Sequence, residues 1–580
     1  MFVHAPRQCA RSPVVLALGL LCAGPSIAVE LATEVPDLKL RWDTTLKYSA
    51  AARLKSQDPV LVANPNLDDG DRNFGKGLIS NRLDALTEFD AVYRDFGMRL
   101  SAAAWYDTVY NRRNDNPGFA GGAFPNQASV AGNEFTAETR KLHGRRAEML
   151  DAFAFAKFKS DAGDVSLRLG QHSLVWGETL FFAGNGIAGA QMPYDVTKLL
   201  TVPNSQAKEF VMPVPQVSAQ WQLAQDVSIG AYYQFRYKPN RLPAVGSYLS
   251  QSDIVVEGGE QLLLGPPFAG PAPRGPDQLP SNGGQGGLQL RWQSQGTDFG
   301  LYAIRFHDKS FQAVTDLGLA PTTIPAAACA GALGPVGVVV GSTCFLAGGP
   351  TGYHVTYQQG TQAFGFSASR TFGDANVAIE ASIRRNQALS SSHAFDVSGL
   401  GAAKSNNTNN PAYAVGDTAH INVSTLWQLP STPLWREGTL LGEIAWNRVL
   451  RCKTNCSIGT PTSGTLDPNA TRDAVALRVV FQPTYRQVLT GLDIDVPIGL
   501  GYSPKGSRSM ALGAGAMPPD GGGDFSIGVN GALYDQWRFS LSATHYFGRV
   551  GPLLDSGNSF TYKQTFKDRD FIAASLRRTF

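Results

Sequence analysis

Hydrophobic and polar residues alternate without interruption from Leu38 to Leu54. One face of this segment carries Trp42 and Tyr48 among apolar residues, and the other carries charges such as Lys47 and Arg53. A period of two predicts a β-strand, because successive side chains point to opposite sides of the backbone. The strand exceeds the usual length of about 5–6 residues and is long enough to cross a bilayer, which takes ~9–11 residues. We therefore expect this strand to form part of a wall, with its apolar face toward lipid and its charged face toward water.

The alternation recurs in segments 79–93, 227–237, 419–427, 475–481, 492–500 and 537–547. Short turns, for example at 94–97, 485–487 and 535–536, separate these segments from long loops rich in Gly, Pro and Asn near 55–78, 111–146, 175–211, 238–284, 308–352, 388–416, 451–471, 501–522 and 548–569. Outer-membrane barrels show this rhythm of short periplasmic turns and long extracellular loops. Counting gives about 18 strands, with Gly360 leaving segment 353–371 ambiguous. We predict an all-β fold, a single transmembrane antiparallel β-barrel over residues 29–580.

Composition and the first residues agree with export. Charged residues make up 17% of the chain, below the ~25% of soluble proteins, and the net charge of +3 does not indicate a nucleic-acid partner. Residues 1–28 resemble a signal peptide, with a basic start, an apolar stretch and a small-x-small cleavage site at 26–28. Cys22 raises a lipoprotein alternative, which Leu21 before it disfavours. Together with the barrel pattern, this predicts a bacterial outer-membrane location.

Four cysteines remain after cleavage, in two local pairs. Cys329 lies near Cys344, and Cys452 lies near Cys456. An exported protein meets an oxidising compartment, so we predict two disulfides in extracellular loops. A zinc site is the weaker interpretation, because the C-x3-C pair lacks a second pair of ligands.

The chain ends on Phe580. Exported barrels commonly finish with an aromatic residue that the barrel-assembly machinery recognises, so we expect outer-membrane lipid and this machinery as partners. Arg578 interrupts the apolar face of the last strand. We expect its stem to lie along lipid while its head reaches water.

Two candidate ligand sites fall in the loop 55–78. The run from Gly70 to Gly77 almost matches a phosphate-binding loop, but Gly77 stands where that motif needs Ser or Thr. Carboxylates and amides cluster here, and the weak calcium candidates are Asp68, Asp69, Asp71 and Asn73. The glycine is misplaced for an EF-hand, so a solvated turn is favoured. We predict no cofactor.

The chain carries no H-E-x-x-H and no G-x-S-x-G motif, and its eight histidines do not cluster in sequence. We therefore predict that it is not an enzyme, with a hydrolase assembled from separate strands as the open alternative. The inward faces of the strands carry both signs of charge. This favours a solvated, mutually paired lumen wall over a charge-selective constriction.

The segment 175–211 is a long apolar loop. After Trp176-Gly177-Glu178 it runs through Leu180-Phe181-Phe182 and returns through several prolines. Such a loop must bury itself in the lumen or at the outer mouth. Either it lines a path for an apolar solute, with Trp176 as its anchor, or it packs and narrows the pore. The candidate path residues are Trp176, Glu178, Leu180, Phe181 and Phe182.

This region resembles a family of proteobacterial outer-membrane proteins of unknown function. The shared motifs are Arg168-Leu169-Gly170-Gln171, Trp176-Gly177-Glu178, Pro193, Asp195-Val196, Lys198-Leu199 and Pro213-Val214-Pro215, with Asp68-Asp69-Gly70, Asn73-Phe74, Lys76-Gly77 and Asn81-Arg82 nearer the N-terminus. His172 and Met192-Pro193-Tyr194 depart from the family pattern. The resemblance implies an outer-membrane barrel encoded beside a periplasmic lipoprotein-sorting-like protein and an inner-membrane RND-type (MMPL) transporter. It also implies a link to catabolism of steroids, hydrocarbons or other apolar compounds.

These observations lead to one functional prediction and two alternatives. We predict an outer-membrane channel or transport component for hydrophobic or amphiphilic small molecules, working with the periplasmic carrier and RND-type transporter that the resemblance implies. A general diffusion porin for polar solutes is the first alternative. A surface or structural barrel without transport is the second.

Overall fold

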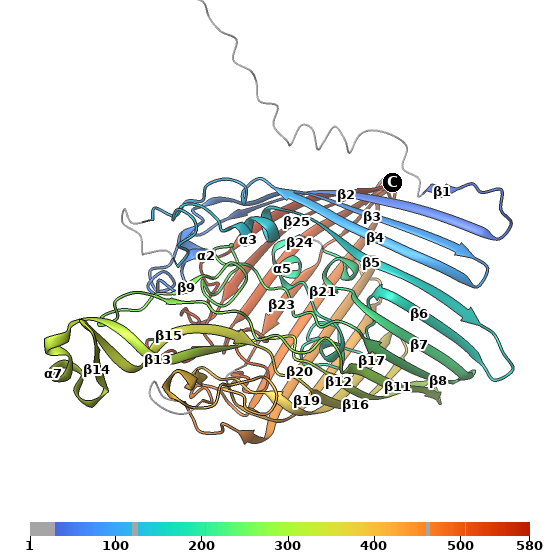
Figure 1. Cartoon of the computed structure of the whole chain (residues 1–580). Coiled ribbons are helices and arrows are strands. Elements are labelled where there is room, and N and C mark those ends of the chain that lie inside the picture. The colour runs from blue at the N-terminus through green and yellow to red at the C-terminus, as the bar shows by residue number, and fades with distance from the viewer. Residues whose placement is uncertain (1–28, 119–125, 204, 460–464, 505) are drawn as a thin grey trace, which may run out of the picture.

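In the computed structural model, residues 29–118, 126–203, 205–459, 465–504 and 506–580 are described, so the predicted signal peptide at 1–28 lies outside them. The described strands close into an antiparallel barrel of 18, because β26 pairs with β2 (Figure 1). In order around the wall they are β2 (Leu38–Arg53), β3 (Gly77–Tyr93), β4 (Phe96–Asp107), β5 (Arg145–Phe158), β6 (Asp164–His172), β7 (Val214–Ala224), β8 (Val227–Gln234), β11 (Gln285–Ser294), β12 (Thr297–Phe306), β16 (Thr361–Phe372), β17 (Ala375–Ala388), β19 (Val415–Leu429), β20 (Glu437–Thr454), β21 (Asp473–Leu489), the interrupted strand β22 (Leu492–Asp495) and β23 (Ile498–Tyr502), β24 (Gly523–Leu533), β25 (Trp537–Phe547) and β26 (Phe571–Thr579).

The two faces of the wall differ as the alternation predicts. On β2, Lys47, Ser49 and Arg53 are buried on the lumen side, whereas Trp42 is exposed on the outer side. Exposed aromatic residues recur near the short turns, at Tyr93, Phe96, Phe158, Trp221, Phe372, Trp427 and Tyr534. A closed barrel leaves no unpaired strand edge, and an apolar outer belt with aromatic borders faces lipid. The protein is therefore a bacterial outer-membrane barrel.

Four features of the structure either differ from what the sequence predicts or settle a point that the sequence left open. The expected loop 308–352 is largely a hairpin of β13 (Gln312–Pro325) and β15 (Thr343–Thr356), which projects beyond the barrel in Figure 1. The ambiguous segment divides at Gly360, whose φ is +79°, between β15 and β16. The turn expected at 485–487 falls instead at 490–491, where Gly491 adopts φ +77°; Gln487 lies in an irregular part of the ladder.

Arg578 is the fourth difference. It does not reach water along the lipid face, since its residue is only 6% exposed. Its guanidinium lies 4.8 Å from the ring centroids of both Trp537 and Phe580. Contact with two aromatic faces offsets the cost of covering a charge near the membrane edge. The expectation of a snorkelling arginine is therefore wrong.

The long loops pack against one another above the wall. Phe74, Tyr110, Phe135 and Tyr248, from three different loops, form one buried aromatic cluster. Short elements within the loops are α2 (Asp69–Arg72), α3 (Ala137–Thr139), η1 (Arg140–Gly144), α4 (Ala188–Gln191), α5 (Val196–Thr201), α6 (Ala207–Phe210), β9 (Gln261–Leu262), β10 (Ala272–Pro273), η2 (Ala326–Ala328), α7 (Cys329–Leu333), η3 (Gly334–Val336), β14 (Gly337–Val340), β18 (Phe395–Asp396) and η4 (Ser398–Leu400). None of the described helices is long and apolar enough to cross a membrane.

Both cysteine pairs are disulfides in loop regions. Cys329 joins Cys344 across the tip of the projecting hairpin, and Cys452, near the end of β20, joins Cys456 just after that strand. The short strand β1 (Val29–Leu31) pairs with β2 beside the end of β26 and so continues the closing seam.

Candidate functional site

The loop between β6 and β7, residues 173–213, folds across the barrel lumen. Its first half contacts the inward faces of β17, β19 and β20, and its second half contacts those of β2, β3 and β5. These two groups of strands lie in different parts of the wall. The loop is therefore held to well-separated parts of the barrel.

Glu380, an inward residue of β17, holds the first half by its backbone. Its carboxylate accepts hydrogen bonds from the backbone N–H of Glu178 at 2.7 Å and of Ile187, and from the hydroxyl of Thr179. Gly177 closes over this carboxylate at φ +96°, and a Cβ there would lie 2.2 Å from Glu380 Oε2. The W-G-E motif thus needs its glycine for close approach as well as for the backbone conformation.

Glu443 on β20 forms a second clamp. Its Oε2 accepts from three successive backbone N–H groups, those of Leu180, Phe181 and Phe182, with the Leu180 and Phe182 bonds both at 3.1 Å. Its Oε1 accepts from Asn422 Nδ2 at 2.6 Å. Hydrogen bonds to an ionised, buried acceptor are the strong ones. Glu443 therefore fixes the segment 180–182 more firmly than packing alone would.

Ion pairs hold the second half of the loop. Asp195 caps α5 by accepting from Lys198 N at 2.9 Å, and it pairs with Arg241 at 2.6 Å. Lys198 reaches Glu148 on β5 at 3.1 Å. Two further pairs, Lys47 with Glu209 at 3.1 Å and Glu88 with Lys208, join β2 and β3 to α6. The charged lumen wall is thus mutually paired, with partners drawn partly from the loop.

The five predicted path residues occupy four environments. Trp176 is buried, with ring centroids 5.1 Å from Tyr232 and 6.2 Å from Tyr302. Phe182 packs against a small apolar cluster beside β20 and β21. Leu180 remains 45% exposed.

Glu178 and Phe181 meet arginines of the wall. The Glu178 carboxylate lies 3.7 Å from Arg291, and Arg478 lies 6.0 Å from the ring centroid of Phe181. Glu380 and Glu443 escaped the sequence interpretation because each was one inward polar residue among many. One signal could have identified Glu380 and Glu443. Each is a carboxylate on an inward strand face, and the glycine-rich loop 173–213 offers backbone N–H groups that need acceptors.

The calcium candidates of loop 55–78 separate into two groups. Asp68 and Asp69 lie beside Asp253, which comes from the loop after β8. Asp71 instead pairs with Arg53 at 2.6 Å, and Asn73 donates to the Gly246 carbonyl at 2.9 Å. Asp253 stands far from the other candidates in sequence, so no spacing rule could have included it.

A family model described as "Protein of unknown function (DUF1302)" matches residues 10–580. None of the curated proteins matches the chain significantly. Among solved structures, similar folds include Acinetobacter baumannii OccAB2 (9% identity, covering 93% of this chain and 98% of that one, TM-score 0.40) and Pseudomonas aeruginosa OccD3 (9%, 96% and 95%, 0.39). Salmonella typhi OmpF, in a structure titled as a complex with daunomycin, shares 10% identity over 95% of this chain and 100% of that one, with a TM-score of 0.34.

Proposed function

This chain belongs to the DUF1302 family, and we propose that it is an outer-membrane channel for small hydrophobic or amphiphilic molecules whose loop 173–213 restricts passage. The observation that carries the proposal is the attachment of this loop to well-separated parts of the wall. Solutes must pass between the loop and the wall, so the loop sets which molecules cross. A general diffusion porin needs an open, water-filled passage, and a loop anchored on both sides of the lumen narrows that passage.

The two halves of the loop present different chemistry to a passing solute. Leu180 is 45% exposed beside the Glu443 clamp, with Phe181 next to it. A large apolar side chain left open in a polar lumen offers contact to an apolar group. The other half borders a small cavity of about 20 Å³, where charged residues such as Lys47, Lys198 and Glu209 lie among apolar ones, Leu86, Leu150 and Val202. An amphiphile could match both surfaces, which favours this substrate class over a purely polar one.

The proposed partners follow from the family resemblance alone. A periplasmic lipoprotein-sorting-like carrier and an inner-membrane RND-type transporter would continue the route of an apolar molecule across the envelope. The direction of transport depends on those partners, since the barrel has no energy source of its own.

Transport assays on the purified protein test the proposal. Proteoliposomes are assayed for flux of an amphiphilic steroid and of a sugar of similar mass, and planar bilayers record conductance. We expect steroid flux above that of protein-free vesicles, little sugar flux and low conductance. Leu180→Ser is expected to reduce steroid flux several-fold, because an apolar contact is lost. Leu400→Ser, at a similarly exposed leucine of η4 outside this loop, is the matched control and should leave flux unchanged.

Two results would count against the proposal. A large, stable conductance with sugar flux equal to steroid flux supports the general porin. No flux of either solute, with an intact barrel by heat-modifiable migration on gels, supports a structural barrel.

A further inference from the structure

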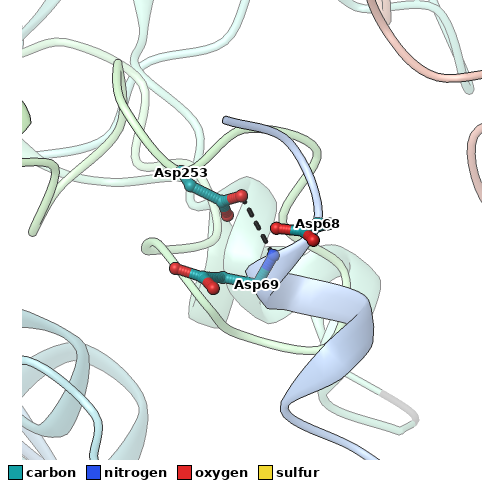
Figure 2. A group of neighbouring side chains, drawn as sticks. All are labelled: Asp68, Asp69 and Asp253. Carbon is teal, nitrogen blue, oxygen red and sulfur yellow. Dashed lines mark hydrogen bonds between the residues drawn. The ribbon is translucent and has the colours of Figure 1, made fainter. Parts of the chain in front are cut away.

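Three carboxylates from two long loops converge on one another. Asp68 and Asp69 begin α2, and Asp253 belongs to the loop that follows β8; Figure 2 shows their side chains gathered together. One oxygen of each lies within 4.8 Å of the others. Asp68 is 1% exposed and Asp253 is fully buried, so bulk water screens these charges little.

Two oxygens of this cluster lack a hydrogen-bond partner. Asp253 Oδ2 accepts from the backbone N–H of Asp69 at 3.0 Å, but Asp253 Oδ1 has no partner in the part of the chain that the structure describes. Asp68 likewise uses one oxygen for Arg72 and leaves Oδ1 without one among the described residues. A buried carboxylate oxygen without a partner costs free energy comparable to a lost hydrogen bond or more. A bound cation would therefore stabilise both oxygens, Asp68 Oδ1 and Asp253 Oδ1.

The protein supplies too little positive charge for three carboxylates. Arg72 pairs with Asp68. Arg569 is the other cation nearby, and it donates to the Tyr248 and Ser250 carbonyls. A divalent cation would balance the remaining charge.

We propose that Asp68, Asp69 and Asp253 bind a calcium ion that fastens the first extracellular loop to the loop after β8. All the donors are oxygens, which hard cations prefer over zinc or copper. Calcium accepts irregular geometry and sheds its water readily, whereas magnesium retains several waters and demands an octahedron. The site is buried, which favours calcium. An adjoining cavity of about 10 Å³, lined by Asp69, Asn73 and Gln127, leaves room for about one water as a further ligand.

Calcium binding can be measured on the full-length protein in detergent, after EDTA and removal of lipopolysaccharide. Isothermal titration with CaCl2 should give one saturable site at or below the ~10⁻⁴–10⁻³ M range of extracellular calcium modules, and MgCl2 should bind at least tenfold more weakly. Asp253→Asn keeps an oxygen for the Asp69 N–H but removes the charge. It should weaken calcium binding at least tenfold and remove calcium protection of the loop after β8 from protease.

The control variant is Asp316→Asn, which removes a carboxylate on the projecting hairpin and should bind calcium as the wild type does. Correct assembly of each variant is checked by heat-modifiable migration on gels; if Asp253→Asn fails to assemble, Asp69→Asn replaces it. The proposal is overturned if the wild type shows no saturable calcium binding, if magnesium binds equally well, or if the cluster variant keeps wild-type affinity.

Discussion

Removing the Glu443 carboxylate should release the loop that crosses the lumen. The carboxylate accepts from four donors, three on the loop and one on Asn422. Each hydrogen bond to a charged acceptor contributes about 1.5–3 kcal/mol, but bonds that share one acceptor do not add. Glu443→Ala leaves neutral donors without a partner rather than an unpaired charge, so we adopt the range of a single charged hydrogen bond, about 1.5–3 kcal/mol, as the minimum loss. At 1.4 kcal/mol per tenfold, the released population of the segment 180–182 should rise by at least about 10–10².

Single-channel recording in planar bilayers measures this change. We expect Glu443→Ala to show frequent openings of higher conductance than the wild type, and Glu443→Gln to show an intermediate effect, because the amide oxygen still accepts. Glu437→Gln on the same strand is the matched control, since Glu437 pairs with exposed Arg486 away from the loop. Leu180→Cys, introduced in each background, reports loop release independently through its rate of maleimide labelling.

Equal conductance and equal labelling in Glu443→Ala and wild type would refute the role of Glu443 as a clamp. An effect of the same size in Glu437→Gln would show that loss of any charge on β20 disturbs the barrel. Either outcome would remove the main support for a loop-restricted channel.

Four further predictions concern other parts of the molecule. Trp176→Ala should lower barrel stability by about 3–5 kcal/mol, seen as a lower urea midpoint, because the indole fills a buried aromatic site; an unchanged midpoint would contradict this. Replacing Cys329 and Cys344 by Ser removes a crosslink across 15 residues, worth about 3 kcal/mol, and should speed protease cleavage of the hairpin while leaving conductance unchanged. Burial lowers the pKa of Lys309 to about 7, so the unfolded chain binds the extra proton between pH 7 and the ordinary pKa of 10.5; wild-type stability should rise with pH across that window, and Lys309→Met should lose this slope. Deleting Phe580 should reduce the yield of heat-modifiable barrel in the outer membrane, and an unchanged yield would show that assembly does not depend on it.

The wall could be predicted from sequence because its determinants are local. Alternation at Leu38–Leu54 predicts β2 almost to the residue, and 537–547 matches β25. A strand in a lipid-facing barrel must repeat outward apolar and inward polar positions, so the pattern recurs along the chain. The family was also recognised from its motifs, and the family model covers residues 10–580.

The site was predicted only in part, because its partners are distant in sequence. The sequence pointed to the W-G-E segment. The contacts of Glu380 and Glu443 with this loop could not be predicted, because only the folded barrel brings these residues together. Asp253 joins Asp68 for the same reason. The hairpin within 308–352 was missed because its Gly and Pro residues are typical of loops, whereas pairing between β13 and β15 overrides that preference.

The clamped loop also orders the events of assembly. Glu178 is 202 residues before Glu380, and the segment 180–182 is more than 260 residues before Glu443. Contacts between such distant residues form late, since the intervening chain must first be placed. The loop therefore cannot bind in the lumen until the strands β17 to β20 have folded into the barrel. An assembling barrel passes through a stage in which its first strands are placed while this loop is still free, and the contacts between β2 and β26, more than 500 residues apart, close the wall later still.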